Sequence, residues 1–340
     1  MKPVIFGLSA QALTPDERAF FREADPAGYI LFKRNIEDRD QLRALTDDLR
    51  GLSGREDLLI MIDQEGGRVA RMQPPVWPAF PSAEPFDRLY ARAPASAIAA
   101  AKANARAIAA TLRDVGINVD ALPLLDLRLE GQSDIIGDRA LGADPMQVAA
   151  LGRAVLDGLR AGGVAGIVKH MPGHGRAAVD SHQALPTVTA SAEELEADIA
   201  PFRSLAWAPM GMTAHIVYAG WDAERPASLS PIVIGDIIRG RIGFDGLLMS
   251  DDLDMKALSG SIGSGDMGSL AAGVVAAGCD IALNCWGRMD DMTAIADALP
   301  AIGNLSRARL DRAMATIAAG PDDADMAAMI AKRDALLALA

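Results

Sequence analysis

The sequence predicts a (β/α)8 barrel, or TIM barrel, that forms a single domain over residues 1–340. Eight short apolar runs alternate with longer helix-period segments along the 340 residues. Most of these runs are continuously apolar, which is typical of parallel strands covered by helices on both faces. Half of the residues are hydrophobic and no linker or short repeat interrupts the pattern, so one large barrel fits better than two small domains.

The strands are expected where the apolar runs are bounded by turn residues or by helix signals. These runs cover residues 4–8, 29–32, 58–62, 118–122, 166–168, 211–216, 247–249 and 280–283.

Helix start signals lie between the expected strands. TPDE at 14–17 offers an N-cap threonine, a proline at the first helical position and a capping-box glutamate, and DPMQ at 144–147 repeats the pattern. Ser191 with Glu194 forms a further capping box, and an alanine-rich helix over 97–115 is followed by a glycine that can end it. Residues 305–340 are expected to be extra C-terminal helices packed outside the barrel.

Composition limits the classes of partner. The formal net charge is −12 and the isoelectric point is near 4.8, which argues against nucleic acid or an anionic membrane surface. Cys279 and Cys285 lie in one apolar segment and are expected to be buried thiols in a reducing compartment. The N-terminal apolar run is too short for a signal peptide, and no apolar stretch is long enough to span a membrane. We therefore expect a soluble, cytoplasmic monomer.

A barrel predicts that reactive groups follow the C-terminal ends of the strands. Polar side chains do cluster at those positions. They are Asp63, Arg68 and Arg71 after the third strand, Arg139 after the fourth, Lys169 and His170 at the fifth, His215 at the sixth, and Asp251 and Asp252 at the seventh.

Residues 169–182 (KHMPGHGRAAVDSH) hold three of the four histidines. Asp180 lies two residues before His182, so its carboxylate could orient the imidazole for proton transfer; the alternative is a surface loop with two unrelated polar residues. His170 and His174 have the i, i+4 spacing of some zinc sites, but the proline and glycine between them disfavour the helix that such a site needs. We therefore expect no metal, and Lys169 with His170 to donate to substrate oxygens.

Carboxylates at two strand ends are the other candidates. Asp251 or Asp252 could act as nucleophile, general base or metal ligand, with Asp251 nearest the strand end, whereas Asp252 could be a helix N-cap. Asp63 with Arg71 offers an acceptor and planar donors for sugar hydroxyls; a structural ion pair is the alternative. The Gly/Ser-rich segment 259–268 matches no phosphate-binding pattern and is expected to be a mobile loop over the site.

Six segments spread over most of the chain carry a family pattern. They are DQEGGRV at 63–69, IGDRALG at 136–142, KHMPGHG at 169–175, DSH at 180–182, MTAHIVY at 212–218 and GFDGLLMSDDLDM at 243–255. Together they resemble glycoside hydrolase family 3, and within it the single-domain bacterial exo-β-N-acetylglucosaminidases of peptidoglycan recycling.

This resemblance implies a retaining double displacement without a cofactor. Asp251 is implied as the nucleophile, and His182, paired with Asp180, as the acid/base. The substrate is then a GlcNAc-containing saccharide, namely GlcNAc-anhydro-muramyl peptides. The implied sugar contacts are Asp63, Arg71, Arg139, Lys169 and His170. Asp254 departs from the pattern, because a small residue is common there, and it adds a negative charge close to Asp251.

Four other readings remain open. A β-glucosidase of the same family is disfavoured by the His182 loop, and phosphorolysis could replace hydrolysis. A metal-dependent hydrolase would use His170, His174 and Asp251. A catalytically inactive sugar-binding protein would bind saccharides without turnover.

Overall fold

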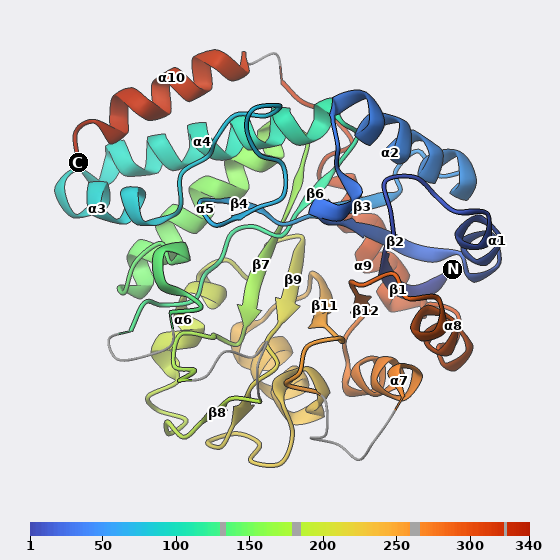
Figure 1. Ribbon diagram of the computed structural model, residues 1–340. Helices are drawn as coiled ribbons and strands as arrows, with labels where there is room; N and C mark the ends of the chain where they lie inside the picture. Colours follow the sequence, from blue (N-terminus) through green and yellow to red (C-terminus); the bar gives the residue numbers. More distant parts are fainter. Residues whose placement is uncertain (130–133, 179–184, 259–265, 323–324) are drawn as a thin grey trace.

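The computed structural model describes residues 1–129, 134–178, 185–258, 266–322 and 325–340 (Figure 1). Within these ranges, eight parallel strands close into a barrel in the order β1, β2, β3, β6, β7, β9, β11, β12. They are β1 (Lys2–Gly7), β2 (Pro26–Leu31), β3 (Leu59–Ile62), β6 (Val119–Asp120), β7 (Ala165–Met171), β9 (Met210–Thr213), β11 (Leu247–Asp252) and β12 (Ile281–Asn284). Each overlaps a strand expected from the sequence, so the (β/α)8 barrel is confirmed.

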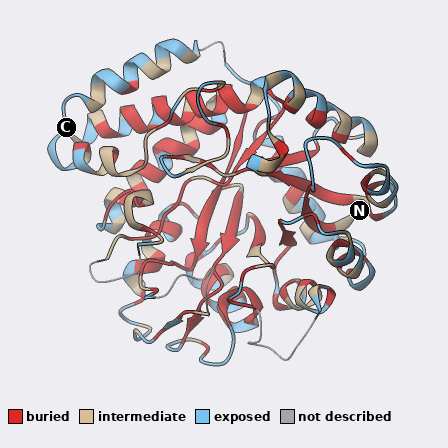
Figure 2. Cartoon of the chain, in the orientation of Figure 1, coloured by how far each residue is buried: buried red, intermediate tan, exposed pale blue. Residues whose placement is uncertain are grey.

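Helices surround the strands, and Figure 2 shows the strands buried and the outer helical faces exposed. The helices are α1 (Pro15–Ala24), α2 (Arg39–Ser53), α3 (Glu84–Arg92), α4 (Pro94–Asp114), α5 (Pro145–Ala161), α6 (Glu196–Ser204), a π-helix (Val233–Ile242), α7 (Met267–Ala277), α8 (Met289–Ala298), α9 (Asn304–Ala315) and α10 (Met326–Leu337).

The expected helix starts are formed. Thr14 and Glu17 make the reciprocal bonds of a capping box at α1, and Asp144 caps α5 by accepting from the N–H of Gln147. Ser191 and Glu194 also bond each other, but the regular turns of α6 start two residues later. Of the segment expected to be a loop, residues 259–265 lie outside the described residues and α7 begins at its end.

The C-terminal helices pack on the barrel at two places. Leu310 and Met314 of α9 join the apolar cluster of the barrel interior, so α9 covers the N-terminal end of the strands. The last helix, α10, lies along α4, where the Arg333 guanidinium donates to Asn104 Oδ1 over 3.0 Å (Figure 1). No helix among the described residues is long and apolar enough to cross a membrane.

Two small sheets shape the opposite, C-terminal end of the barrel. β4 (Gln64–Gly66) and β5 (Val69–Ala70) form an antiparallel hairpin directly after β3. β8 (Thr187–Val188) pairs in parallel with β10 (Val217–Tyr218), and so ties the segment after β7 to the segment after β9. Both sheets lie on loops that follow barrel strands, where the reactive groups are expected.

Candidate active site

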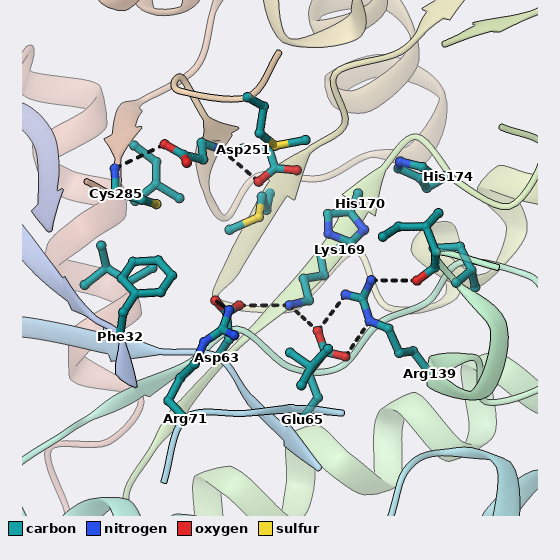
Figure 3. Close-up of a pocket in the computed structure, with 18 of the residues that line it drawn as sticks. Phe32, Asp63, Glu65, Arg71, Arg139, Lys169, His170, His174, Asp251 and Cys285 are labelled. Carbon is teal, nitrogen blue, oxygen red and sulfur yellow. Dashed lines mark hydrogen bonds and ion pairs between the residues drawn. The ribbon is translucent and has the colours of Figure 1, made fainter. Parts of the chain in front are cut away.

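A cavity of about 260 Å³ opens at the C-terminal end of the barrel (Figure 3). Its lining comes from the ends of several different strands and from the loop after β6. The contributors include Phe32 after β2, Asp63 and Glu65 after β3, Arg139 after β6, Lys169 and His170 of β7, Asp251 of β11 and Cys285 after β12. The structure thus brings together the described site residues that the sequence singled out, including Arg71, with the exception of His215. That imidazole is fully buried behind the cavity, where Nδ1 lies 2.7 Å from Ser228 Oγ and Nε2 lies 3.0 Å from the Asp252 carbonyl oxygen.

The hairpin β4–β5 is held by one buried amide. The Gln64 side chain accepts from the backbone N–H groups of Arg71 and Met72 and donates to the Met72 carbonyl. A Cβ on Gly66, which has a φ of +102°, would lie 2.1 Å from the Pro81 carbonyl oxygen. Only glycine fits this close approach, which fixes the hairpin and with it the side chain of Glu65.

One wall of the cavity is a row of ion pairs. Lys169 Nζ lies 2.6 Å from Glu65 Oε1 and 3.2 Å from Asp63 Oδ1. Arg139 binds Glu65 with two parallel hydrogen bonds of 2.7 and 2.8 Å, and Arg71 binds Asp63 over 2.9 Å. The Lys169 side chain is only 2% exposed. The row therefore presents fixed donors and acceptors, which suits sugar hydroxyls.

The electrostatics keep this row ionised. Burial alone would raise the pKa of Glu65 and of Asp63, but Lys169 and the neighbouring guanidiniums outweigh it and hold both pKa values below the ordinary range. Burial alone would lower the pKa of Lys169, but Glu65 and Asp63 raise it above its usual value. Each group is charged at neutral pH because its partners are.

His170 and His174 share one buried carboxylate. Asp126 Oδ2 lies 2.8 Å from His170 Nδ1, and Asp126 Oδ1 accepts from the backbone N–H groups of His170 and His174 over 3.1 and 2.7 Å. The Nδ1 proton of His170 is therefore held by Asp126, which leaves Nε2 for the cavity. Burial lowers the pKa of His174 to about 4, so this imidazole is neutral.

The contacts of His170 and His174 also concern the alternative of a metal-dependent hydrolase that would use both histidines with Asp251. The rings of His170 and His174 are 5.7 Å apart, and Asp126 occupies one nitrogen of the first. Among the described residues, no group of three or more His, Cys, Asp or Glu side chains is arranged to hold a metal ion.

Replacing Asp126 with asparagine is expected to lower kcat/KM about 10²-fold. The amide would retain an acceptor for the backbone but would present its NH2 group to His170, which favours the wrong tautomer of the imidazole. Hydrolysis of a nitrophenyl N-acetylglucosaminide measures the effect. Asp120→Asn is the matched control, because Asp120 is also fully buried and also accepts a backbone N–H, but contacts none of the described histidines. An equal loss in both variants would contradict the positioning role.

Asp251 and Asp252 end β11 at the cavity. The backbone N–H of Asp252 donates to Asp251 Oδ1 over 2.8 Å. Asp252 Oδ1 accepts from the N–H groups of Asp254 and Cys285 over 3.2 and 3.1 Å. It therefore stabilises a turn; the next helix, α7, starts only at Met267, so Asp252 is not a helix N-cap. Figure 3 shows Asp251 across the cavity from the ion-paired wall.

Asp254, the departure from the family pattern, is compensated in the fold. Its carboxylate pairs with the Arg288 guanidinium and accepts from Asn284 Nδ2 over 2.6 Å. Burial, with the Asp254 charge as the next contribution, raises the pKa of Asp252 to about 7. The extra charge therefore acts on Asp252.

Asp252→Asn is expected to stabilise the protein increasingly as the pH rises from 5 to 8. Because the pKa of Asp252 is higher in the folded than in the unfolded chain, the wild type loses stability as the pH rises from about 4 through about 7. The variant lacks this loss. Urea unfolding of both proteins at several pH values measures the difference, and a difference that is constant over this range would contradict it. Asp254→Asn should shrink the same pH dependence.

The acid/base pair that the family resemblance implies, Asp180 and His182, lies outside the described residues. The described segments on either side are anchored. Before it, the Tyr218 hydroxyl donates to the Gly173 carbonyl over 2.7 Å and Arg176 binds Asp198 over 2.7 Å. After it, β8 pairs with β10.

Sequence reasoning missed two functional side chains. Glu65, within the quoted DQEGG motif, is the shared partner of Lys169 and Arg139. Asp126 follows the fourth strand, and the rule that reactive groups follow strand ends could have found it. Its neighbours in sequence are apolar, so residue type alone gives no sign of a polar site there.

A barrel with paired carboxylates, cations and histidines around a cavity at its C-terminal face belongs to the class of TIM-barrel enzymes, and its row of fixed donors and acceptors suits a sugar substrate. The chain matches the pattern described as the glycosyl hydrolase family 3 N-terminal domain over residues 9–319, and it belongs to that family. It is a glycoside hydrolase of the β-N-acetylhexosaminidase type.

Relatives of known name cover most of the chain. A β-hexosaminidase of Bordetella avium is 39% identical over 286 residues, which are 83% of this chain and 80% of that protein. A β-hexosaminidase of Aromatoleum aromaticum is 37% identical over 316 residues, 91% of this chain and 86% of that protein. The crystal structure of NagZ from Neisseria gonorrhoeae in complex with N-trifluoroacetyl-D-glucosamine superposes with a TM-score of 0.85 at 32% identity, and covers 99% of this chain and 96% of that one.

Proposed function

We propose that this chain is a retaining exo-β-N-acetylglucosaminidase. It removes terminal, non-reducing β-linked GlcNAc from peptidoglycan-derived muropeptides through a covalent glycosyl-enzyme. The observation that carries the proposal is the placement of Asp251 across a one-sugar cavity from the Asp63–Lys169–Glu65–Arg139 row. The row can fix the sugar hydroxyls while the carboxylate faces the anomeric carbon.

In the first step, an Asp251 carboxylate oxygen attacks the anomeric carbon and the glycosidic C–O bond breaks. The bonding electron pair goes to the leaving oxygen, which takes a proton from His182. In the second step, His182, oriented by Asp180, removes a proton from water. The water oxygen attacks the anomeric carbon, and the bond to Asp251 breaks. Two inversions leave the β configuration in the product.

Retention and the covalent step can be tested separately. Proton NMR of the reaction should show β-GlcNAc before α-GlcNAc accumulates by mutarotation. A fluorinated N-acetylglucosaminide with a good leaving group should leave one sugar on the protein, and peptide mass analysis should place it on Asp251. First formation of the α anomer would overturn the retaining mechanism.

The substrate class needs a second comparison. Nitrophenol release from the β-N-acetylglucosaminide should far exceed release from the β-glucoside, with a chelator present in both assays. A GlcNAc-anhydro-muramyl disaccharide should be cleaved with a higher kcat/KM than chitobiose. Preference for the glucoside would retain the family and reject the substrate.

We also propose a cytoplasmic site of action, which is where soluble muropeptide fragments would be met after import. Cys279 and Cys285 are both buried free thiols, which is consistent with a reducing compartment. Cell fractionation with the protein tagged at its C-terminus tests this.

A further inference from the structure

An exposed tryptophan stands beside the cavity. Trp286 follows Cys285, which lines the cavity, and its side chain is 55% exposed. The backbone is fixed there, because Gly287 packs so closely on the end of β1 that a Cβ would lie 2.6 Å from the Leu8 carbonyl carbon. A large apolar ring held in solvent at the mouth of a binding site is typical of a contact surface for a ligand.

This ring is the outer member of a stack that begins inside the cavity. The Arg71 guanidinium, which binds Asp63, lies 5.2 Å from the centre of the Phe32 ring. The Arg34 guanidinium lies 4.8 Å from the same ring and 5.6 Å from the Trp286 ring. The alternation of cations and rings therefore runs continuously from the sugar-binding wall to the mouth.

Arg34 brings a charge that makes no ion pair within the part of the chain that the structure describes. Its guanidinium donates to the backbone carbonyls of Leu8 and Cys285, and no described carboxylate lies within ion-pairing distance. By contrast, Arg68, Arg71 and Arg288 are each paired with an aspartate. An arginine fixed by carbonyl groups keeps its charge available for an anion from outside.

We propose that Trp286 and Arg34 receive the leaving-group sugar of the substrate, and that Arg34 favours a sugar whose acid group is free over one in which that group is bound to a peptide as an amide. The inference rests on the proposed function, since it assigns the second sugar position of that site. The cavity of about 260 Å³ holds one sugar unit, so the next unit must lie at the mouth. There, the ring of Trp286 can stack on the apolar face of the sugar, and Arg34 can attract its acid group.

Two substrates that differ only in the leaving group test whether the leaving-group sugar contacts Trp286. One is the disaccharide of GlcNAc and 1,6-anhydro-muramic acid, and the other is N-acetyl-β-glucosaminyl fluoride, whose leaving group is too small to reach Trp286. Trp286→Ala should lower kcat/KM on the disaccharide about tenfold, and at least five times more than on the fluoride. Trp286→Phe should restore most of the loss.

Trp207→Ala is the matched control. Trp207 is 50% exposed and also has an arginine, Arg153, over its ring at 6.0 Å, but it lies before β9 at the opposite end of the barrel. The Trp207→Ala variant should keep the wild-type kcat/KM on both substrates. Equal losses of Trp286→Ala on both substrates, or no loss on either, would overturn the inference.

The contact between Arg34 and the acid group is tested with the same disaccharide and with its methylamide, in which the carboxylate charge is removed. Wild type should prefer the acid, and Arg34→Gln should bring the ratio of the two kcat/KM values close to one; an unchanged ratio would reject the role of Arg34. Each ratio compares two substrates on the same protein. If part of the Arg34→Gln variant is unfolded, both kcat/KM values fall by the same factor and the ratio is unchanged. If wild type cleaves neither the disaccharide nor the fluoride, the proposed function itself fails. If it cleaves both without dependence on Trp286, only this inference fails.

Discussion

Replacing Asp251 with alanine is expected to lower kcat on β-N-acetylglucosaminides by at least about 10⁴-fold. The carboxylate forms the covalent bond in the proposed mechanism, and no other described carboxylate ends β11 in the same position. Asp252 comes next, but its oxygen is occupied by the N–H groups of Asp254 and Cys285. Steady-state kinetics with a nitrophenyl substrate measure the loss.

Two controls make the Asp251 result specific. Azide, a small anion that can enter the vacated space, should restore turnover in Asp251→Ala and give the α-glycosyl azide, because only one inversion then occurs. Asp252→Asn should lose less than about tenfold. Near-normal activity of Asp251→Ala would show that the nucleophile is assigned wrongly.

Lys169→Met is expected to have the largest effect on stability, with a loss of about 3–5 kcal/mol in the free energy of unfolding at pH 7. Methionine fits the volume but removes the ammonium that lies between Asp63 and Glu65, and it leaves two buried carboxylates with one cation fewer. The side chain is 2% exposed, so water cannot replace the lost partner. We expect kcat/KM to fall as well, because the row of sugar contacts loses its central donor.

The pH dependence distinguishes this cause from a packing defect. In the wild type, the lowered pKa values of Glu65 and Asp63 add stability above pH about 4, which is lost as the pH falls through their folded values. In Lys169→Met these pKa values rise, so the difference between the two proteins should narrow from pH 7 to pH 4. The double variant Glu65→Gln/Lys169→Met should be more stable than the sum of the single changes predicts. A difference independent of pH, with additive changes, would indicate a packing defect.

The barrel was predictable because its strands and helices carry local signals. Continuous apolar runs marked all eight strands, and the capping residues at Thr14 and Asp144 marked two helix starts that the structure confirms. The π-helix at Val233–Ile242 was not predicted, because nothing in residue type distinguishes it from an ordinary amphipathic helix.

The sequence could predict which residues lie at the site, but not which of their side chains contact one another. The rule that chemistry follows the C-terminal strand ends placed Asp63, Arg139, Lys169 and Asp251 at one face, where the structure has them. The partner of Lys169 and Arg139 is Glu65, and that contact joins loops that are about 70 to 100 residues apart in sequence. Such pairings depend on the register of the closed barrel, which no local pattern states. The role of Asp126 could not be predicted for the same reason, because its carboxylate binds the backbone N–H groups of His170 and His174, more than 40 residues further along the chain.

The charge balance of the cavity acts as a filter for the sugar that enters it. Although the whole chain carries −12, each described cation that lines the cavity already has a carboxylate partner. Arg68 pairs with Asp138, Arg71 with Asp63, Arg139 with Glu65, and Lys169 with both Asp63 and Glu65. A neutral pyranose can displace water from this wall without adding net charge to a poorly solvated space, whereas a uronic or muramic acid would bring a charge without a counter-ion. The inner position thus selects against acidic sugars before any contact with the acetamido group is considered, and it leaves the recognition of acids to the mouth.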